Sequence, residues 1–294
     1  MNTRLDVIFW GIRASKAEKA FENCIQKVEQ LELVLSRYHK DSELFNLNHK
    51  ALNKPVKLSL SLWNAIKLAS TYYELTQGYF DIRFGKLYDQ LKSGASPKGD
   101  SVLPFIETVV LNEPLQTVKF CNENISFDFG GVGKGMALEA IASCIDKADI
   151  QNAFVSFGGS SVLTRGSHPH GDYWPFSLAE NKETNRIWQL NNHCISVSRT
   201  KREVDNGVLP HIYNTVNNKA ATSVNTVVIQ NTNAVEAEVL STALVAAPIS
   251  MHATIAKQFE NCTIDIFGST TNFPKSEKIG FRYSTPFLKG VNKS

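Results

Sequence analysis

Residues 128–135 read Asp-Phe-Gly-Gly-Val-Gly-Lys-Gly, a run of four glycines around a single lysine. Before the glycines, apolar and polar side chains alternate over 124–129, as they do in a half-buried strand. After them, apolar side chains recur at helical spacing from Ala137 to Cys144. The stretch therefore predicts a strand, a tight turn and then a helix over 134–147.

Such a turn can bind an anion. Glycine lacks the Cβ that keeps a ligand away from the backbone, so several N–H groups can approach a phosphate at the start of a helix. Lys134 would add a full positive charge at the same place. The run is neither a Walker A loop nor a Rossmann Gly-x-Gly-x-x-Gly fingerprint. On these residues alone, a phosphate-binding turn and a plain structural turn both stay open.

The rest of the chain predicts an α+β fold. Periodic apolar residues indicate helices near 15–36, 43–48, 61–76 and 235–247, the third of which ends at Gly78. Residues 90–103 read as a surface loop. Short strands are expected near 106–112, 116–120, 124–129, 152–158, 174–179, 187–190, 193–198, 223–230, 262–266 and 278–283. Runs of neighbouring strands with few helices between them favour antiparallel sheets packed against long helices.

Composition narrows the class of protein. The chain has 294 residues, 43% hydrophobic and 20% charged, with a net charge of +3 and five cysteines at wide spacing. We expect no nucleic-acid partner, no disulfide framework and no membrane span. If Met1 is the true start, the lack of an apolar signal core or lipidation cysteine in the first residues predicts a cytoplasmic protein. If residues are missing before Met1, a periplasmic lipoprotein is the expectation.

Further blocks accompany the glycine run. They are Leu35-Ser-Arg-Tyr-His-Lys-Asp-Ser-Glu-Leu-Phe-Asn-Leu-Asn48, Thr76-Gln-Gly-Tyr-Phe-Asp81, Val155-Ser-Phe-Gly-Gly-Ser-Ser161, Pro210-His-Ile-Tyr-Asn214 and Ala237-Glu-Val-Leu-Ser-Thr-Ala243. Taken in this order and spacing, the blocks resemble the ApbE family of FAD:protein FMN transferases, from Met1 to about Ala247. The resemblance implies a T-fold-like α+β architecture and a single FAD-binding transferase domain over 1–294, with two lobes as an open variant.

The resemblance also implies an activity. Family members bind FAD and Mg²⁺, cleave the pyrophosphate and move FMN onto a threonine or serine hydroxyl of a partner flavoprotein, with AMP leaving. The acceptor motif of the family resembles Asp-x-x-Ser/Thr-Gly-Ala-Ser/Thr. The expected partners are therefore FAD and an acceptor flavoprotein, and a homodimer stays open.

Site residues follow from the resemblance, residue by residue. Lys134 lies beside the FAD phosphates, and His211 or a nearby carboxylate takes the proton of the attacking hydroxyl. The metal ligands fall on the Gly131 carbonyl, Glu238 and Thr242, of which the last two share one face of a helix. The FAD-binding positions are Met1, Tyr38, Tyr79, Phe80, Asp81, Asp128, Lys134 and Ile212.

The sequence departs from the family pattern at two of these places. Glu238 stands where the family has aspartate, and Asn214 stands where it has a second aspartate. If Glu238 is a strained replacement, Glu238→Asp improves Mg²⁺ binding; if the backbone suits glutamate, the same change impairs it. Two alternatives to the transferase are therefore kept: an FAD pyrophosphatase that gives FMN and AMP, and a catalytically impaired FAD-binding protein.

Overall fold

A computed structural model describes residues 3–93, 105–178, 186–204, 207–268 and 281–284. Its main element is a seven-stranded sheet in the order β1-β5-β6-β9-β14-β15-β16. Neighbouring strands are antiparallel except for the parallel pair β15–β16. The strands are β1 (Leu5–Trp10), β5 (Asn152–Phe157), β6 (Ser161–Arg165), β9 (Cys194–Arg199), β14 (Thr226–Asn231), β15 (Thr263–Phe267) and β16 (Phe281–Ser284).

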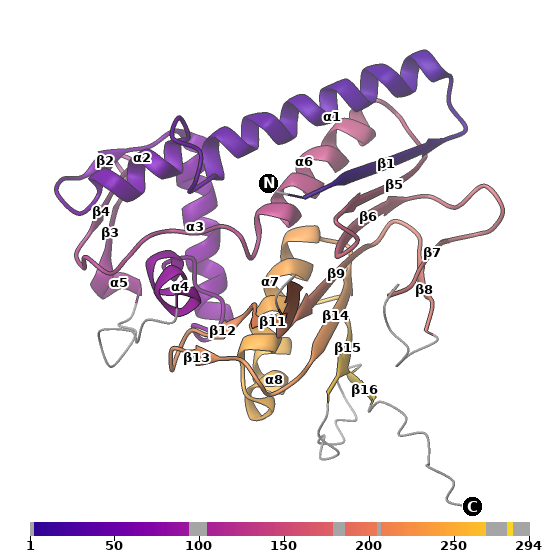
Figure 1. Cartoon of the computed structure of the whole chain (residues 1–294). Helices are drawn as coiled ribbons and strands as arrows, with labels where there is room; N and C mark the ends of the chain where they lie inside the picture. Colours follow the sequence, from indigo (N-terminus) through magenta and orange to yellow (C-terminus); the bar gives the residue numbers. More distant parts are fainter. Residues whose placement is uncertain (1–2, 94–104, 179–185, 205–206, 269–280, 285–294) are drawn as a thin grey trace, which may run out of the picture.

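Helices cover one face of this sheet (Figure 1). Helix α6 (Gly133–Lys147) and helix α7 (Ala234–Ala246) pack on the strands, and the long helix α1 (Ala14–Leu35) crosses α6 on the outside. Helix α7 is buried on nearly all sides, which fits a mostly apolar sequence whose polar residues, Glu238 and Ser241 among them, are buried as well. Helix α8 (Ile249–Ala256) follows it. This layering confirms the α+β class with antiparallel strands and long helices.

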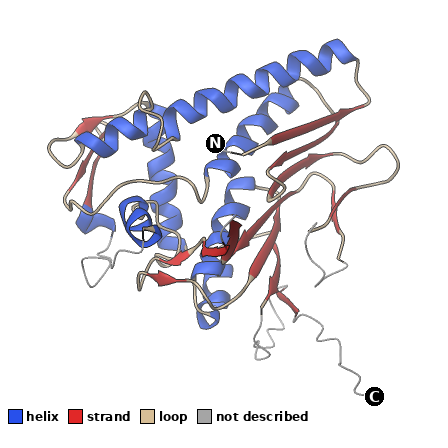
Figure 2. Ribbon diagram, in the orientation of Figure 1, coloured by secondary structure: helices blue, strands red, loops and turns tan. Residues whose placement is uncertain are grey.

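A second group of elements lies beside the first (Figure 2). It holds α2 (Glu43–Lys50), α3 (Leu60–Leu75), α4 (Gly85–Lys92), α5 (Phe105–Thr108) and a small sheet in the order β2 (Val56–Lys57), β4 (Thr117–Phe120), β3 (Val109–Asn112). One cluster of buried side chains runs from Leu44 and Leu62 in this group to Leu240 in α7 and Ile229 in β14. The two groups thus share a core, and the extent of the domain over 1–294 stays a prediction.

Three two-stranded ribbons complete the described chain. They are β7 (Trp174–Phe176) with β8 (Trp188–Leu190), β10 (Lys201–Val204) with β11 (Gly207–Pro210), and β12 (Tyr213–Asn214) with β13 (Lys219–Ala220). The last two ribbons carry the 210–218 segment toward the helices of the second group (Figure 1).

The strand predicted at 124–129 is wrong. Apart from one bridge between Ser126 and Phe84, this segment pairs with no strand among the described residues. The side chain of Asn48 takes the place of a neighbouring strand: its amide donates to the Phe127 carbonyl at 2.9 Å, and its oxygen accepts from the Phe127 N–H at 2.8 Å. Ile125, Ser126 and Phe127 are all buried, so the alternating pattern of apolar and polar residues reflects neither a sheet ladder nor one exposed face.

Two other predicted segments also begin differently. Residues 105–108 form the short helix α5, so the strand expected at 106–112 starts only at Val109. Helix α4 reaches Lys92, so the loop expected at 90–103 begins later, and residues 94–104 lie outside the described part. The helix predicted over 61–76 is confirmed as α3, and Gly78 terminates it with a φ of 80°.

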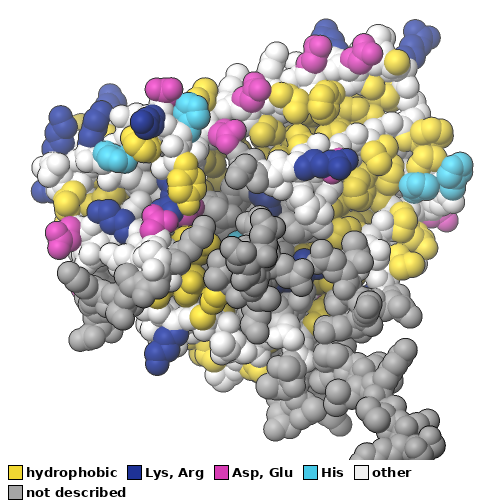
Figure 3. Space-filling model, in the orientation of Figure 1, with side chains coloured by type: hydrophobic (Ala, Val, Ile, Leu, Met, Phe, Trp, Pro, Cys, Tyr) yellow, Lys and Arg dark blue, Asp and Glu magenta, His cyan; other side chains and the backbone are white. Residues whose placement is uncertain are grey.

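The surface is of mixed charge. In the view of Figure 3, acidic and basic side chains are interspersed, and apolar side chains gather over the α1 and β1 region. Ile8, Trp10 and Phe21 are among the exposed large apolar residues there. Within the described ranges, we find no helix that is both long and apolar enough to cross a membrane.

His252 on α8 makes the stability of the fold depend on pH. Its side chain is completely buried, and neither ring nitrogen has a well-aligned hydrogen-bond partner. Burial lowers the pKa of His252 from its ordinary value of 6.5, and the carbonyls of Ala247 and Leu244 offset part of this effect. The unfolded chain therefore takes up a proton at a pH where the folded chain does not.

We expect the free energy of unfolding to fall as the pH drops below about 6.5, by at most ~1.4 kcal/mol per pH unit, until His252 is protonated in the folded state as well. Urea unfolding from pH 7.5 to 5 measures this slope. His252→Met should flatten it, whereas substitution of the exposed His39 should not. Identical slopes in wild type and His252→Met would exclude His252 as the source.

Candidate functional site

The glycine run forms the predicted turn and helix start. The Asp128 carboxylate accepts a hydrogen bond from the Gly130 N–H at 2.7 Å, and the Gly133 N–H donates to the Phe129 carbonyl at 2.6 Å where α6 begins. Gly131 lies against α7: the Thr242 hydroxyl is 3.5 Å from the Gly131 carbonyl oxygen. The turn thus brings together two of the three predicted metal ligands.

Gly135 sets how closely α6 approaches α7. A Cβ at this position would lie 2.6 Å from the Ala234 carbonyl oxygen, a distance that real side chains do not reach. Only glycine therefore lets the first turn of α6 meet the start of α7. At this crossing, the Lys134 ammonium lies 2.8 Å from Oε2 of Glu238.

Glu238 is the buried polar centre of the site. Its side chain is 4% exposed, whereas that of Lys134 is 26% exposed. Oε1 of Glu238 accepts hydrogen bonds from the Ser161 hydroxyl on β6 and from the Ser196 hydroxyl on β9, the latter at 3.0 Å. Both carboxylate oxygens therefore have partners, as a buried charge requires.

Two more serine hydroxyls extend this network. Ser241 on α7 is 2.9 Å from the Ser196 hydroxyl and 2.8 Å from the Ser198 hydroxyl. Because an ionised carboxylate only accepts, Ser196 donates to Glu238, and the Ser241 hydroxyl also donates to the Glu238 backbone carbonyl at 3.1 Å. The network thus joins α7 to β6 and β9 beneath the glycine turn.

The oxygen atoms of this place suit a hard divalent cation. A backbone carbonyl at Gly131, a hydroxyl at Thr242 and a carboxylate at Glu238 are ligand types that Mg²⁺ accepts and that zinc disfavours. Nowhere in the described part do three His, Cys, Asp or Glu side chains gather as a metal cluster. These residues therefore fit a divalent cation. The Lys134 ammonium is a second positive charge on the same Glu238 carboxylate.

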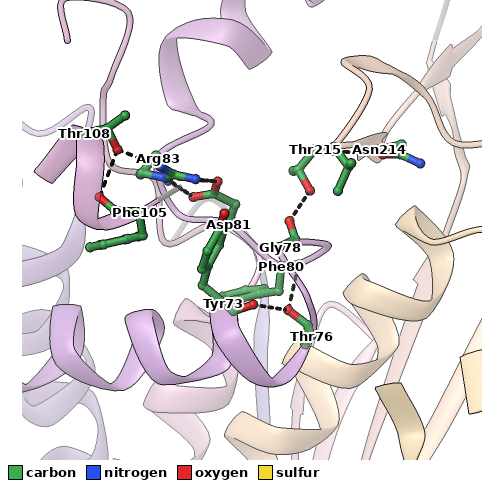
Figure 4. Close-up of polar contacts among 11 residues, drawn as sticks. Tyr73, Thr76, Gly78, Phe80, Asp81, Arg83, Phe105, Thr108, Asn214 and Thr215 are labelled. Carbon is green, nitrogen blue, oxygen red and sulfur yellow. Dashed lines mark hydrogen bonds and ion pairs between the residues drawn. The ribbon is translucent and has the colours of Figure 1, made fainter. Parts of the chain in front are cut away.

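The predicted FAD-binding loop at 79–81 is stabilised by an ion pair between Asp81 and Arg83 (Figure 4). The Asp81 side chain is 1% exposed and pairs with Arg83 at 2.6 Å. Arg83 also donates to the Thr108 hydroxyl at 2.6 Å, and its guanidinium lies 4.8 Å from the Tyr73 ring centre. The Asp81 carboxylate is therefore occupied, so a ligand would meet the backbone of this loop.

The side chains of this loop and of 211–218 lie close together. Phe80 is buried, and its ring would lie 3.5 Å from a Cβ at Gly131; Tyr79 is half-buried. The Thr215 hydroxyl donates to the Gly78 carbonyl at 2.5 Å, which joins the two segments (Figure 4). Loop, turn and ribbon thus converge on one region.

Asn214 shapes its turn without a charge. Its side-chain oxygen accepts from the N–H groups of Val216 at 2.9 Å and Asn217 at 3.1 Å. An aspartate would make the same two contacts, so the neutral residue preserves the turn. His211 precedes it with an exposed side chain, and its N–H donates to the Thr200 carbonyl at 2.8 Å. Ile212 is half-buried against the core.

Arg37 was missed by the sequence analysis. Its side chain is 6% exposed, and its Nε lies 3.0 Å from Oδ2 of Asp128. The same guanidinium pairs with Asp89 on α4 and donates to the Tyr38 hydroxyl at 2.8 Å. It thus links Tyr38, which is 70% exposed, to the glycine turn. The only signal in the sequence was a lone arginine in a polar turn, directly before a predicted FAD contact.

The predicted residues therefore fall into three sets. Lys134, Gly131, Glu238 and Thr242 meet at the crossing of α6 and α7. Asp128 and Tyr38 are joined through Arg37, and the 78–81 loop is joined to 211–218 through Thr215. Met1 lies outside the described residues. As FAD or metal contacts, all of these residues stay predictions.

Comparison with known proteins gives one family. A model of the ApbE family matches residues 1–265. A Klebsiella pneumoniae protein named FAD:protein FMN transferase is 26% identical over 232 residues, which are 71% of this chain and 65% of that protein. A Chlamydia pneumoniae protein of the same name is 26% identical over 181 residues, 57% of this chain and 56% of that protein. The matches span less than two thirds of these relatives.

Solved structures agree on the fold. The chain superposes on the ApbE protein of Thermotoga maritima with a TM-score of 0.72 at 20% identity, covering 90% of each chain. It superposes on the flavin transferase ApbE of Vibrio cholerae with a TM-score of 0.74 at 20% identity, covering 92% of each chain. The architecture is shared over nearly the whole length.

Proposed function

This chain belongs to the ApbE family, and we propose that it is an FAD:protein FMN transferase, which cleaves FAD, releases AMP and attaches FMN to a threonine or serine hydroxyl of an acceptor flavoprotein. The observation that carries the proposal is the meeting of Lys134, Gly131, Glu238 and Thr242 at one glycine turn. The names of the relatives support the same activity.

The turn suits the pyrophosphate of FAD. A pyrophosphate diester carries about two negative charges, and attack at phosphorus adds charge to the leaving oxygen. The first turn of α6 presents its N–H groups and its positive dipole end there. The Lys134 side chain, which is partly exposed, supplies a full charge beside them.

A divalent cation completes the site in this proposal. The Gly131 carbonyl, Glu238 and Thr242 would hold it, and Mg²⁺ is the ion that fits these ligands best. When bound, the cation would neutralise pyrophosphate charge and stabilise the leaving AMP.

The transfer step exchanges one phosphorus–oxygen bond for another. The acceptor hydroxyl oxygen forms a bond to the FMN phosphorus, the bond to the bridging oxygen breaks, and that oxygen leaves with AMP. The hydroxyl proton must pass to a base. His211 has an exposed ring in a segment that Thr215 ties to the 78–81 loop, so we assign this role to His211.

Two competing functions rest on particular residues. Water in place of the acceptor hydroxyl would make the chain an FAD pyrophosphatase. The occupation of Glu238 by Lys134, together with the neutral Asn214, favours an FAD-binding protein without turnover. Incubation with FAD, with and without Mg²⁺ and an acceptor peptide, separates the three. AMP release that requires both supports the transferase, AMP release without the peptide indicates hydrolysis, and bound FAD without AMP indicates a binding protein.

Arg37→Met should weaken FAD binding by roughly tenfold, because Asp128 and Tyr38 lose the cation that holds them in place. FAD titration followed by flavin fluorescence measures this affinity. Arg165→Met is the control, since Arg165 pairs with Asp146 at the opposite end of α6 from the glycine turn. An Arg37→Met protein with wild-type FAD affinity would leave Arg37 without a role in the site.

A further inference from the structure

The two carboxylate oxygens of Glu238 have different surroundings. Oε1 faces the sheet and accepts hydrogen bonds from Ser161 and Ser196. Oε2 faces the glycine turn and has the Lys134 ammonium at 2.8 Å. The serines come from two neighbouring strands of the sheet, whereas Lys134 comes from the end of a helix and is partly exposed. One oxygen is thus anchored, and the other is held by a group with access to solvent.

The hydrogen bonds to Oε1 give a reason for glutamate, rather than aspartate, at position 238. Two serine hydroxyls on β6 and β9 hold Oε1, and the backbone of Glu238 is fixed in the buried helix α7. The residue is therefore fixed at its backbone and at Oε1, and these two constraints set the direction in which Oε2 points. Hydrogen bonds of this kind to a ligating group commonly decide its orientation and affinity for a metal.

A divalent cation held by Gly131, Glu238 and Thr242 would compete with Lys134 for the remaining oxygen. Oε2 has the Lys134 ammonium as its partner, and Thr242, one helical turn after Glu238, has its hydroxyl 3.5 Å from the Gly131 carbonyl oxygen. A cation bound there would neutralise Oε2 in place of the ammonium. The lysine is then free to turn toward an anion at the start of α6, a few ångströms away on its own helix.

We propose that Ser161 and Ser196 are positioning residues that anchor one oxygen of Glu238, and that Lys134 and a divalent cation exchange on the other. This proposal rests on the proposed function only in that FAD supplies the anion that receives the released lysine. It predicts that Mg²⁺ and FAD each raise the affinity for the other, by the same factor. It also predicts that Lys134 opposes Mg²⁺ binding in the free protein while it favours FAD binding.

The anchoring also decides between the two expectations for Glu238→Asp. The shorter side chain cannot reach the serines and the turn at once, so aspartate at this position should bind Mg²⁺ more weakly than glutamate. The structure thus favours the second alternative, in which the surroundings suit glutamate.

Two binding measurements on the full chain test the exchange without turnover. Calorimetry gives the Mg²⁺ affinity without FAD, and flavin fluorescence gives the FAD affinity in the presence of a chelator. Lys134→Met should bind Mg²⁺ about tenfold more tightly and FAD about tenfold more weakly than wild type. Lys134→Arg keeps the charge, so it should show no gain in Mg²⁺ affinity.

The serines are tested in the same way. Ser161→Ala and Ser196→Ala should each weaken Mg²⁺ binding by about 10–100-fold. Ser198→Ala is the matched control, because its hydroxyl contacts Ser241 and not Glu238. Thermal unfolding of each variant shows whether it is folded, and Glu238→Asp should repeat the Mg²⁺ loss without removing any serine.

Opposite results would overturn the proposal. Mg²⁺ affinity that is unchanged or weakened in Lys134→Met excludes the exchange, and unchanged Mg²⁺ affinity in folded Ser161→Ala and Ser196→Ala excludes the anchoring. Because neither measurement involves an acceptor or AMP, they can succeed in a chain that transfers no FMN. Failure of the exchange and failure of the proposed function are thus observed separately.

Discussion

Glu238→Ala is expected to lower AMP release from FAD by about 10²–10³-fold, because the proposed cation site loses its carboxylate ligand, the partner of Lys134. The affinity for FAD should not fall with it. Without its partner, Lys134 is free to meet the pyrophosphate, so FAD should bind as tightly as before or more tightly. Turnover and affinity are therefore expected to move separately, which unfolding of the site would not produce.

The matched control is Glu236→Ala on the same helix, where the carboxylate accepts from the Asn231 side chain at 3.1 Å. It should retain AMP release. Steady-state AMP assays and FAD titrations of both variants, with circular dichroism to establish folding, make the comparison. Equal, Mg²⁺-dependent AMP release from Glu238→Ala and wild type would remove position 238 from the reaction.

Arg83→Met is expected to lower the free energy of unfolding by about 3–5 kcal/mol, because it leaves the buried Asp81 carboxylate without its cation. The Thr108 hydroxyl also loses its donor, and the stacking on Tyr73 and Phe105 is lost. Urea unfolding measures the change. This ion pair supports the 79–81 loop, so FAD affinity should fall together with stability.

Two further variants distinguish the effect of an unpaired buried charge from the effect of losing an arginine side chain in general. Arg165→Met breaks an ion pair with Asp146 in which the arginine side chain is 23% exposed and the aspartate side chain 56% exposed. It should lower the free energy of unfolding by no more than about 1 kcal/mol. Asp81→Leu combined with Arg83→Met removes both charges and should recover part of the stability. If Arg83→Met lowered the free energy of unfolding as little as Arg165→Met, the Asp81–Arg83 pair would contribute little to stability.

The local parts of this molecule could be predicted from its sequence. The glycine run specified a turn and the start of α6, and the spacing of Glu238 and Thr242 specified one face of α7. Each of these features depends on residues close in the chain. The strand expected at 124–129 failed because its backbone bonds to partners far away in sequence that form no strand, namely the side chain of Asn48 and the backbone of residues 82–85.

The pairings within the site could not be predicted in this way. Lys134 was expected at the phosphates, yet it pairs with Glu238 across 104 positions of the chain. Arg37 reaches Asp89 and Asp128 from a turn whose sequence shows only polarity. The sequence left open whether Glu238 is a strained substitution, because the Ser161 and Ser196 hydroxyls that bind its other oxygen lie far from it in the chain. Such contacts depend on how helices and sheet pack, which periodicity does not encode.

The most direct test of the proposed function is the mass of an acceptor peptide. A peptide of the family acceptor pattern, Asp-x-x-Thr-Gly-Ala-Thr, is incubated with the chain, FAD and Mg²⁺, and analysed intact and after fragmentation. We expect one threonine of the motif to gain one FMN with loss of one water, one AMP to appear per modified peptide, and a peptide with alanine in place of both threonines to stay unmodified. AMP without modified peptide, or neither product in the presence of bound FAD, would contradict the assignment as a transferase.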